Sequence, residues 1–382
     1  MKSVAAPAVF SAVAVLALGA LAATDPQALA DYAASVVPVL AFVASMAVVV
    51  NAADGLSTFD ILLGKMRAGL GVRGNSRREA VATWVLIFGA SVVSTIFFSL
   101  DTTAILLTPI ALKLAASSGL NPTRAALTVV WTANLGSMLL PISNLTNLLA
   151  VQTPVFAGTA DFVTASWRPA VALLVVAAVA PWLAPVGRQG EWREAQRPGW
   201  TRPAVMFSLL LAVLLVALLS PLPVWASAGV AALVALAMLA RWNRPGVRLS
   251  LVPWSSLILT LALTAVAALV HRLGLLDPVT EGVGSLIDAP LAAAACGAGL
   301  ANVVNNIPAY LALEPALGSR EGLIALLIGV NAGPVITPWA SLATLLWAEQ
   351  ARRQGVRIGW GRFVLCGLVL APVSVVAATA VI

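Results

Sequence analysis

Apolar runs long enough to cross a lipid bilayer recur along the whole chain. A transmembrane helix needs about 20 predominantly apolar residues to span ~30 Å of hydrocarbon. Such runs occupy 5–23, 36–52, 163–186, 204–220, 222–240, 251–271 and 363–382. Charged residues make up only 10% of the chain, whereas roughly 25% is usual for a soluble domain. The sequence therefore predicts an all-α polytopic membrane protein, with the lipid bilayer as its main solvent and no soluble domain.

The distribution of basic residues predicts an orientation. Two further segments, 84–117 and 290–317, contain polar breaks and are expected to enter and leave the membrane on the same side. With a cytoplasmic N-terminus, 19 of the 22 lysines and arginines then fall in cytoplasmic loops, as the positive-inside rule requires. We therefore expect a multi-pass inner-membrane protein that retains its first helix. The net charge of +7 is explained by these loops, so a nucleic-acid partner is excluded.

An internal repeat relates the two halves of the sequence. Residues 134–149 (NLGSMLLPISNLTNLL) align with 331–346 (NAGPVITPWASLATLL) at an offset of 197, with six of sixteen positions identical. The matched asparagine, glycine and proline are informative because such residues are costly within a membrane-spanning helix. Polar breaks precede both copies, at 99–103 (SLDTT) and 302–306 (NVVNN). The pattern is typical of transporters built from repeats.

These breaks predict two inverted repeats, each with a re-entrant helical hairpin and a broken transmembrane helix. The first repeat is 1–186, with an inward-opening hairpin at 84–117 and a broken helix at 124–152. A cytoplasmic linker covers 187–203. The second repeat is 204–382, with an outward-opening hairpin at 290–317 and a broken helix at 323–350. A short interfacial helix is expected at 59–70, after the second span.

Polar side chains at these breaks form the predicted binding site for a substrate or ion. They are tolerated at membrane depth only where they line a cavity or are buried in protein. Asp101 is the best candidate for a coupling-ion or proton site, since an isolated carboxylate there is costly unless neutralised; capping of the hairpin tip is its alternative role. The full predicted set is Asp101, Thr102, Asn134, Ser143, Asn144, Asn147, Asn305, Asn306, Asn331, Thr337, Ser341 and Thr344.

The sequence offers little for catalysis or for metal binding. Its two cysteines, Cys296 and Cys366, have no CxxC spacing, and its one histidine, His271, follows an apolar span. Neither an HExxH nor a GxSxG motif is present, and a hydrolase would need such a constellation. We therefore expect no enzyme activity, no cofactor and no metal site.

Four motifs resemble those of the arsenite-efflux permeases of the ion transporter superfamily. They are 100–110 (LDTTAILLTPI), 141–148 (PISNLTNL), 304–308 (VNNIP) and, most specifically, 333–347 (GPVITPWASLATLLW). The resemblance runs from about residue 84 to the C-terminus.

The resemblance implies export of arsenite or antimonite in exchange for protons, the hairpin-containing inverted-repeat fold, a homodimer, and in some members a cytoplasmic ATPase subunit. It maps Asp101, Asn144, Asn147, Asn305, Asn306, Ser341 and Thr344 onto the hairpin tips and helix breaks of the family. The chain departs from the family at Asn134 and Asn331, where some permeases carry aspartate, so proton coupling through those positions is not available. Its N-terminal half is also a helix shorter than in longer members.

Three alternatives stay open. A sodium-coupled carboxylate or oxyanion symporter of the same superfamily would bind Na⁺ rather than H⁺, and its hairpin tips typically read Ser-Asn-Thr, unlike the Leu100-Asp101-Thr102 and Asn305-Asn306-Ile307 found here. A sodium/proton antiporter would use Asp101 equally well. A non-transporting receptor or scaffold would not need matched breaks in both halves.

Overall fold

The computed structural model describes residues 5–59, 61, 77–186, 199–218, 220, 222–275 and 289–382, which are helical with connecting turns and contain no strand. The expected interfacial helix at 59–70 and the linker at 187–203 lie largely outside these residues. The helices are α1 (Ala5–Thr24), α2 (Pro26–Gly55), α4 (Arg77–Phe98), α5 (Leu100–Ala116), α6 (Pro122–Leu135), α7 (Leu145–Val151), α8 (Thr159–Leu183), α9 (Arg202–Leu218), α10 (Val224–Trp242), α11 (Trp254–Arg272), α13 (Pro290–Val304), α14 (Asn306–Leu313), α15 (Arg320–Ala332), α16 (Leu342–Arg353) and α17 (Trp360–Thr379). Short 3-10 turns follow several of them: η1 (Gly136–Met138), η2 (Pro141–Ser143), η3 (Arg244–Gly246), η4 (Leu249–Leu251), η5 (Glu314–Ala316) and η6 (Gly333–Val335).

Within the described residues, α2, α4, α8, α10 and α17 are long and apolar enough to cross a membrane, and α1, α9, α11 and α13 contain shorter apolar helices. The expectation of an all-α protein with several apolar helices is therefore confirmed. The start of one helix differs from the sequence-based expectation: the apolar run begins at residue 36, whereas α2 begins at Pro26. The Asp25 carboxylate caps this helix by accepting hydrogen bonds of 3.0 Å from the N–H groups of Gln27 and Ala28, and capping outweighs the modest hydrophobicity of the first turns.

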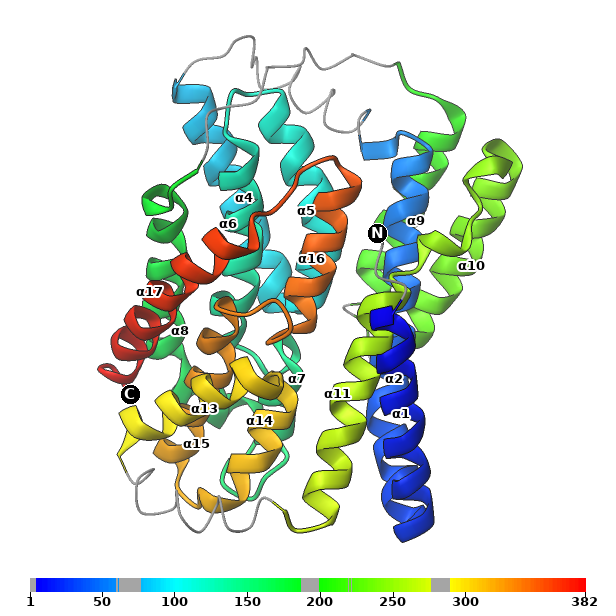
Figure 1. Cartoon of the computed structure of the whole chain (residues 1–382). Coiled ribbons are helices and arrows are strands. Elements are labelled where there is room, and N and C mark those ends of the chain that lie inside the picture. Colours follow the sequence, from blue (N-terminus) through cyan, green and yellow to red (C-terminus); the bar gives the residue numbers. More distant parts are fainter. Residues whose placement is uncertain are drawn as a thin grey trace.

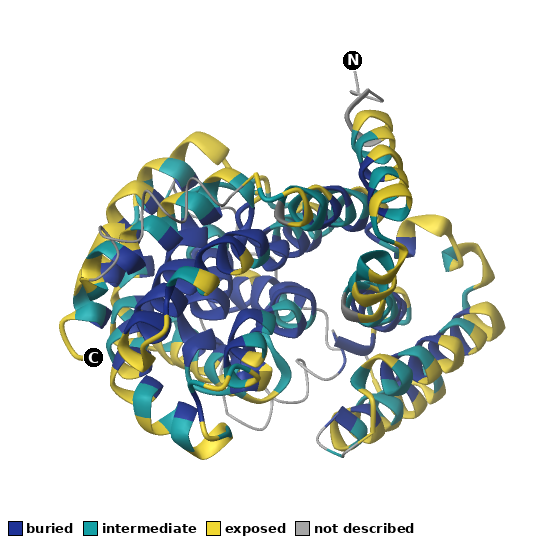
Figure 2. Cartoon of the chain, turned by 90° about the horizontal axis from the view of Figure 1, so that it is seen from below, coloured by how far each residue is buried: buried dark blue, intermediate teal, exposed yellow. Residues whose placement is uncertain are grey.

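The helices form two groups, which Figure 2 shows side by side when the molecule is seen from below. The outer group consists of α1, α2, α9, α10 and α11, and the core group of α4–α8 and α13–α17 (Figure 1). The groups contact each other where α2 packs on α5 and where α11 packs on α14 and α16. Most of the buried residues belong to the core group (Figure 2).

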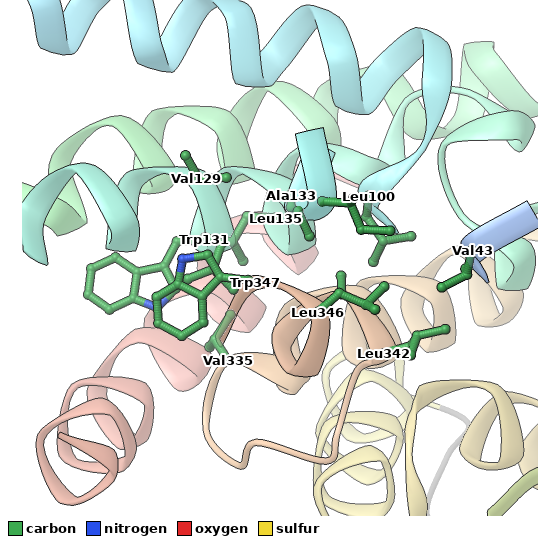
Figure 3. Packing of buried hydrophobic residues seen from close by; sticks show 14 of the residues in the cluster. Val43, Leu100, Val129, Trp131, Ala133, Leu135, Val335, Leu342, Leu346 and Trp347 are labelled. Carbon is green, nitrogen blue, oxygen red and sulfur yellow. The ribbon is translucent and has the colours of Figure 1, made fainter. Parts of the chain in front are cut away.

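The centre of the core group is formed by α6 and α15. Every residue from Ala125 to Leu135 and from Gly322 to Ala332 is buried. Trp131 of α6 and Trp347 of α16 are both among the buried hydrophobic residues around this centre (Figure 3). The indole N–H of Trp347 donates a 2.7 Å hydrogen bond to the carbonyl of Ala126 in α6. The two central helices, α6 and α15, lead into the two aligned stretches of the sequence, 134–149 and 331–346, so each copy of the repeat begins at the end of a buried central helix.

A single non-helical residue separates the helices of two adjacent pairs. Ser99 lies between α4 and α5 with φ 96°, and Asn305 lies between α13 and α14 with φ 100°. Both backbones occupy the region that favours glycine. Each side chain caps the second helix, accepting from the N–H of Thr102 and Ile307 respectively. In Figure 1, α4 and α5 occupy the upper half of the core group and α13 and α14 the lower half.

The two central helices are followed by irregular chain and then by a second helix. After α6 ends at Leu135, η1 and η2 intervene before α7 begins at Leu145. After α15 ends at Ala332, η6 and a turn intervene before α16 begins at Leu342. Backbone groups freed here find side-chain partners: Asn147 donates to the carbonyls of Ser137 and Leu140 at 2.7 and 3.1 Å. Backbone groups at the breaks are therefore hydrogen-bonded by side chains of the protein itself.

Candidate functional site

A cavity of about 350 Å³ lies between the two groups, where four helices of the core group begin. Its wall contains Asp101 in the first turn of α5 and Asn144, the N-cap of α7. It also contains Asn306, the first residue of α14, and Ser341, the N-cap of α16. The structure thus brings together four of the twelve predicted site residues, two from each half of the sequence.

The electrostatics of this wall favour negative charge or electron-rich oxygen. The beginnings of α5, α14 and α16 all line the cavity, and each helix carries a partial positive charge at its N-terminal end. Asp101 lies in the first turn of α5, where that charge stabilises a carboxylate. Among the described residues, none forms a hydrogen bond or ion pair with the Asp101 carboxylate, which leaves both its oxygens available to a ligand or a proton.

The opposite wall comes from α2 and α11 of the outer group. The Tyr32 hydroxyl lies 2.9 Å from the hydroxyl of Thr264 and donates to the carbonyl of Leu261 at 3.3 Å. The Thr260 hydroxyl is buried and has no hydrogen-bond partner among the described residues. These residues were not predicted from the sequence. In the sequence, Thr260 and Thr264 lie one helical turn apart and therefore share a helix face, and this spacing could have indicated a polar wall.

Charged residues gather at one end of the cavity, where α1 passes into α2. Asp31 and Arg272 both line it there, and Arg272 Nε forms a 2.7 Å ion pair with Asp25 Oδ2. The hydrogen bond from the Ala28 N–H, with a smaller contribution from Arg272, holds the pKa of Asp25 below its usual value. Arg272 is the basic residue of the lining, and its charge is already compensated by Asp25.

A second cavity of about 370 Å³ shares Asp101 and Asn144 with the first. It extends between α2 and α7 toward Leu218 and Trp225, at the ends of α9 and α10. Asp101 therefore lies between two cavities, and a solute in either one would reach its carboxylate.

A buried amide network lies behind the first cavity, centred on Asn331 at the end of α15. The Asn331 carbonyl oxygen accepts from the amide of Asn144 and, at 3.3 Å, from the hydroxyl of Ser137. Its amide nitrogen donates to Asn147 Oδ1 at 3.0 Å. Three predicted residues, Asn144, Asn147 and Asn331, are thus joined directly, and Asn144 links the network to the cavity.

The network repeats across the two halves, with one difference. Asn331 donates to Asn147, and the equivalent residue Asn134 donates to Thr344, the equivalent of Asn147, at 3.5 Å. Asn144 also donates to Asn331. The equivalent pair in the other half is Ser341 and Asn134, yet Ser341 Oγ and Asn134 Oδ1 are both buried without a partner among the described residues. The shorter Ser341 side chain thus leaves two buried polar atoms unpaired, and Ser341 is the one of the two residues that lines the cavity.

Four predicted residues hold the breaks in place and do not line the cavity. The Thr102 hydroxyl donates to the carbonyl of Phe98 at 2.8 Å and the Ser143 hydroxyl to that of Ile96 at 2.9 Å. Asn305 donates to the carbonyl of Trp339 at 2.8 Å, and the Thr337 hydroxyl donates to Asn302 at 3.1 Å. The contacts of Ser143, Asn305 and Thr337 join each single-residue turn to the break that follows it in sequence, whereas the Thr102 contact stays within the first turn.

Asn302 is a further residue that supports the breaks, and it was not among the predicted site residues. Its amide donates to the carbonyls of Ala298 and Gly333, both at 2.8 Å, and its carbonyl oxygen accepts from the N–H of Thr337 at 2.9 Å. The sequence signal for Asn302 was its place in the polar stretch 302–306.

Within the described residues, no group of three or more histidine, cysteine, aspartate or glutamate side chains could hold a metal ion. Cys296 and Cys366 are free and partly buried.

Comparison with known protein families shows to which family this chain belongs. The family model described as the citrate transporter, CitMHS, matches residues 1–321. The chain belongs to the CitMHS family. That match includes α1 to α14 and ends in the first turn of the second central helix, α15.

Relatives of this CitMHS-family chain carry a more specific name. The arsenical pump membrane protein of Escherichia coli K12 is 28% identical over 334 residues, covering 78% of this chain and 75% of the relative. The protein of the same name from Yersinia enterocolitica is 28% identical over 335 residues with the same coverage. A putative arsenical pump membrane protein of Bacillus subtilis is 23% identical over 137 residues, which cover 32% of this chain and 31% of the relative. These matches confirm the family resemblance that the four sequence motifs predicted.

As a member of the CitMHS family, the chain is a multi-pass membrane transporter for a small solute. The apolar exposed residues of its helices, such as those of α8 and α9, therefore face lipid. The cavity containing Asp101 is its candidate binding site.

Proposed function

We propose that this transporter exports a small neutral oxyacid, of the class of arsenous or antimonous acid, in exchange for protons. The observation that carries the proposal is the cavity that Asp101, without a described partner, lines together with Asn144, Asn306 and Ser341. Neutral amides and hydroxyls both donate and accept hydrogen bonds, as a polyhydroxylated neutral solute requires. The names of the relatives point to the same class of solute.

The exchange follows from competition at one carboxylate. A hydroxyl group of the solute donates a hydrogen bond to an oxygen of ionised Asp101, and a proton on that oxygen removes the acceptor. Protonation therefore releases the solute, and loss of the proton restores the site. Alternation of the site between the two sides of the membrane then couples proton entry to solute exit.

The proposed architecture is the pair of inverted repeats, 1–186 and 204–382, with re-entrant pairs α4–α5 and α13–α14. It is supported by Ser99 and Asn305, which have nearly the same backbone angles and the same capping role. It is also supported by the exchange of hydrogen bonds between equivalent positions, from Asn331 to Asn147 and from Asn134 to Thr344.

The proposed orientation places the N-terminus in the cytoplasm and the protein in the inner membrane. Support comes from the basic residues that the sequence places around or after the ends of α2, α5, α10 and α16, such as Lys65, Lys113, Arg244 and Arg357, since cytoplasmic loops are enriched in lysine and arginine. The homodimer and the ATPase subunit remain predictions from the family resemblance.

The first experiment is transport in everted membrane vesicles with an acidic interior. We expect arsenite to accumulate inside and the accumulation to collapse when an ionophore removes the proton gradient. Asp101→Asn should remain in the membrane but lose gradient-driven accumulation, because an amide cannot exchange a proton in this pH range. Asp161→Asn, which changes a carboxylate at the surface, ion-paired with Arg320, is the matched control and should accumulate arsenite normally. Wild-type accumulation by Asp101→Asn would refute the coupling role.

A sodium-coupled carboxylate symporter is the second candidate. It is favoured by the three helix N-termini that line the cavity, an arrangement that attracts anions, and by the description of the matching family as citrate transporter. Sodium-dependent uptake of citrate into right-side-out vesicles, with no movement of arsenite, would select it.

A further inference from the structure

A third cavity lies on the core group, between α8 and α17. It has a volume of about 510 Å³ and is lined by apolar side chains of these two helices together with Trp131 of α6 and the thiol-bearing Cys366. The rim is open to the surroundings: Leu183 is 78% exposed and Leu365 is 67% exposed. In a protein that spans a membrane, an apolar groove of this kind lies in contact with lipid acyl chains.

Two arginines stand at one end of this groove. Arg124 Nε donates a 3.0 Å hydrogen bond to the carbonyl of Pro181, which lies between the lining residues Ala180 and Leu183 of α8. Its guanidinium carbon also lies 4.6 Å from the centre of the Trp182 ring. Arg362 precedes the lining residue Leu365 by three positions in α17, so it lies one turn further along the same face.

The positive charge at this end is not compensated within the described residues. Neither Arg124 nor Arg362 forms an ion pair with a described carboxylate. Arg124 lies near the start of α6 and Arg362 near the start of α17. Lys113 and Arg357 lie close to these helix starts in the sequence, so the two arginines belong to the end of the groove nearest the bilayer surface. A cationic end and an apolar body are the two features that recognise a lipid with an anionic headgroup.

We propose that the groove between α8 and α17 binds an anionic phospholipid, with an acyl chain along α8 and α17 and the phosphate at Arg124 and Arg362. A guanidinium forms paired, charge-assisted hydrogen bonds with phosphate oxygens. The planar Trp182 ring beside Arg124 restricts the orientation of the guanidinium, so less freedom is lost on binding.

Other occupants fit these features less well. A neutral lipid would fill the apolar body but would leave both arginines without a counter-charge. A second copy of this chain on the same face would bring two more arginines to the same end, and like charges in contact oppose association.

The test compares lipids of equal chain length and different headgroup charge. The purified protein is transferred to mixed micelles containing phosphatidylglycerol or phosphatidylcholine, and retained lipid is counted by native mass spectrometry. We expect wild type to retain phosphatidylglycerol about tenfold more than phosphatidylcholine, since charged hydrogen bonds contribute at this level. The double variant Arg124→Gln with Arg362→Gln should lose that preference and retain the two lipids equally.

Matched controls separate this site from general surface charge. Arg241→Gln with Arg244→Gln removes the same charge from exposed positions around the end of α10, and it should keep the preference. Val369→Trp fills the groove without changing charge, and it should lower retention of both lipids. Thermal unfolding in lipid-free micelles checks that each variant is folded.

Three outcomes would overturn the proposal. The first is equal retention of the two lipids by wild type, and the second is an undiminished preference in the arginine double variant. The third is a phosphatidylglycerol-independent dimer that Val369→Trp dissociates, which would assign the groove to a second copy. None of these readouts depends on the transported solute.

Discussion

Ser341 and Asn144 occupy equivalent positions in the two halves but contact different groups. The Asn144 amide donates to Asn331 within the buried network, whereas the Ser341 hydroxyl lines the cavity and has no described partner. A buried polar atom without a partner is costly, and a ligand that supplies the partner recovers that cost on binding. Asn144 therefore contributes mainly to stability and Ser341 mainly to binding.

Alanine substitutions at these two positions separate the roles. Asn144→Ala removes a donor to a buried carbonyl and should lower the free energy of unfolding by about 1–3 kcal/mol. Ser341→Ala removes a hydroxyl that has no partner, so stability should change by less than about 1 kcal/mol while the apparent affinity for solute falls. Thermal unfolding in micelles and the concentration dependence of vesicle transport measure the two effects. Equal destabilisation by both variants, with unchanged affinity for Ser341→Ala, would contradict this assignment.

At the scale of elements, the close approach of α13 and α15 depends on a glycine. A Cβ atom placed on Gly329 would lie 2.1 Å from the carbonyl oxygen of Ala294. That atom belongs to the backbone of α13 and cannot move aside without shifting the helix. Because α15 is buried from Gly322 to Ala332 in the centre of the core group, a shift between these helices would also move Asn331 at its end.

Gly329→Ala should therefore destabilise the protein by about 1–3 kcal/mol or more, as overpacking in buried sites does. The matched control is Gly299→Ala in α13, where a Cβ would meet nothing within 4 Å. That variant should be neutral or slightly stabilising, since alanine is the better helix former. The melting temperatures of the two variants provide the measurement, and a Gly329→Ala protein as stable as wild type would show that the two helices separate easily.

At the scale of the whole molecule, one acidic residue joins the outer group to both halves of the core group. Lys113, in the last turn of α5, forms a 2.5 Å ion pair with Asp54 of α2. Gln354, which follows α16, donates to the other oxygen of Asp54 at 3.2 Å. These contacts lie at the end of the molecule opposite Asp25 and Arg272, so they fix the two groups where the first cavity does not reach.

Asp54→Asn should weaken this link and widen the distribution of distances between the groups. Spin labels at the exposed positions 57 and 357, in a background with Cys296→Ala and Cys366→Ala, report that distance by electron paramagnetic resonance. Glu349→Gln is the control, because it breaks ion pairs confined to α16 and should leave the distribution unchanged. An unchanged distribution in Asp54→Asn would show that apolar packing alone holds the groups together.

The sequence by itself determined the membrane class, the helices and the family. Apolar runs specify helices because lipid offers backbone groups no partner, and the four motifs identified relatives that the comparisons confirmed. It also predicted Asp101, Asn144, Asn306 and Ser341 as site residues, since polar side chains at membrane depth are costly unless they bind a ligand or another protein group. These are local properties, and each can be recognised from a short stretch of sequence.

The tertiary structure alone decided which polar residues face a cavity and which support the breaks. Thr102 and Asp101 are neighbours in sequence, yet one caps a helix turn and the other lines the cavity. Tyr32, Thr260 and the link through Asp54 arise from helices that are distant in sequence and packed together. Such roles depend on which face of a helix meets which neighbour, and packing of the whole chain sets that.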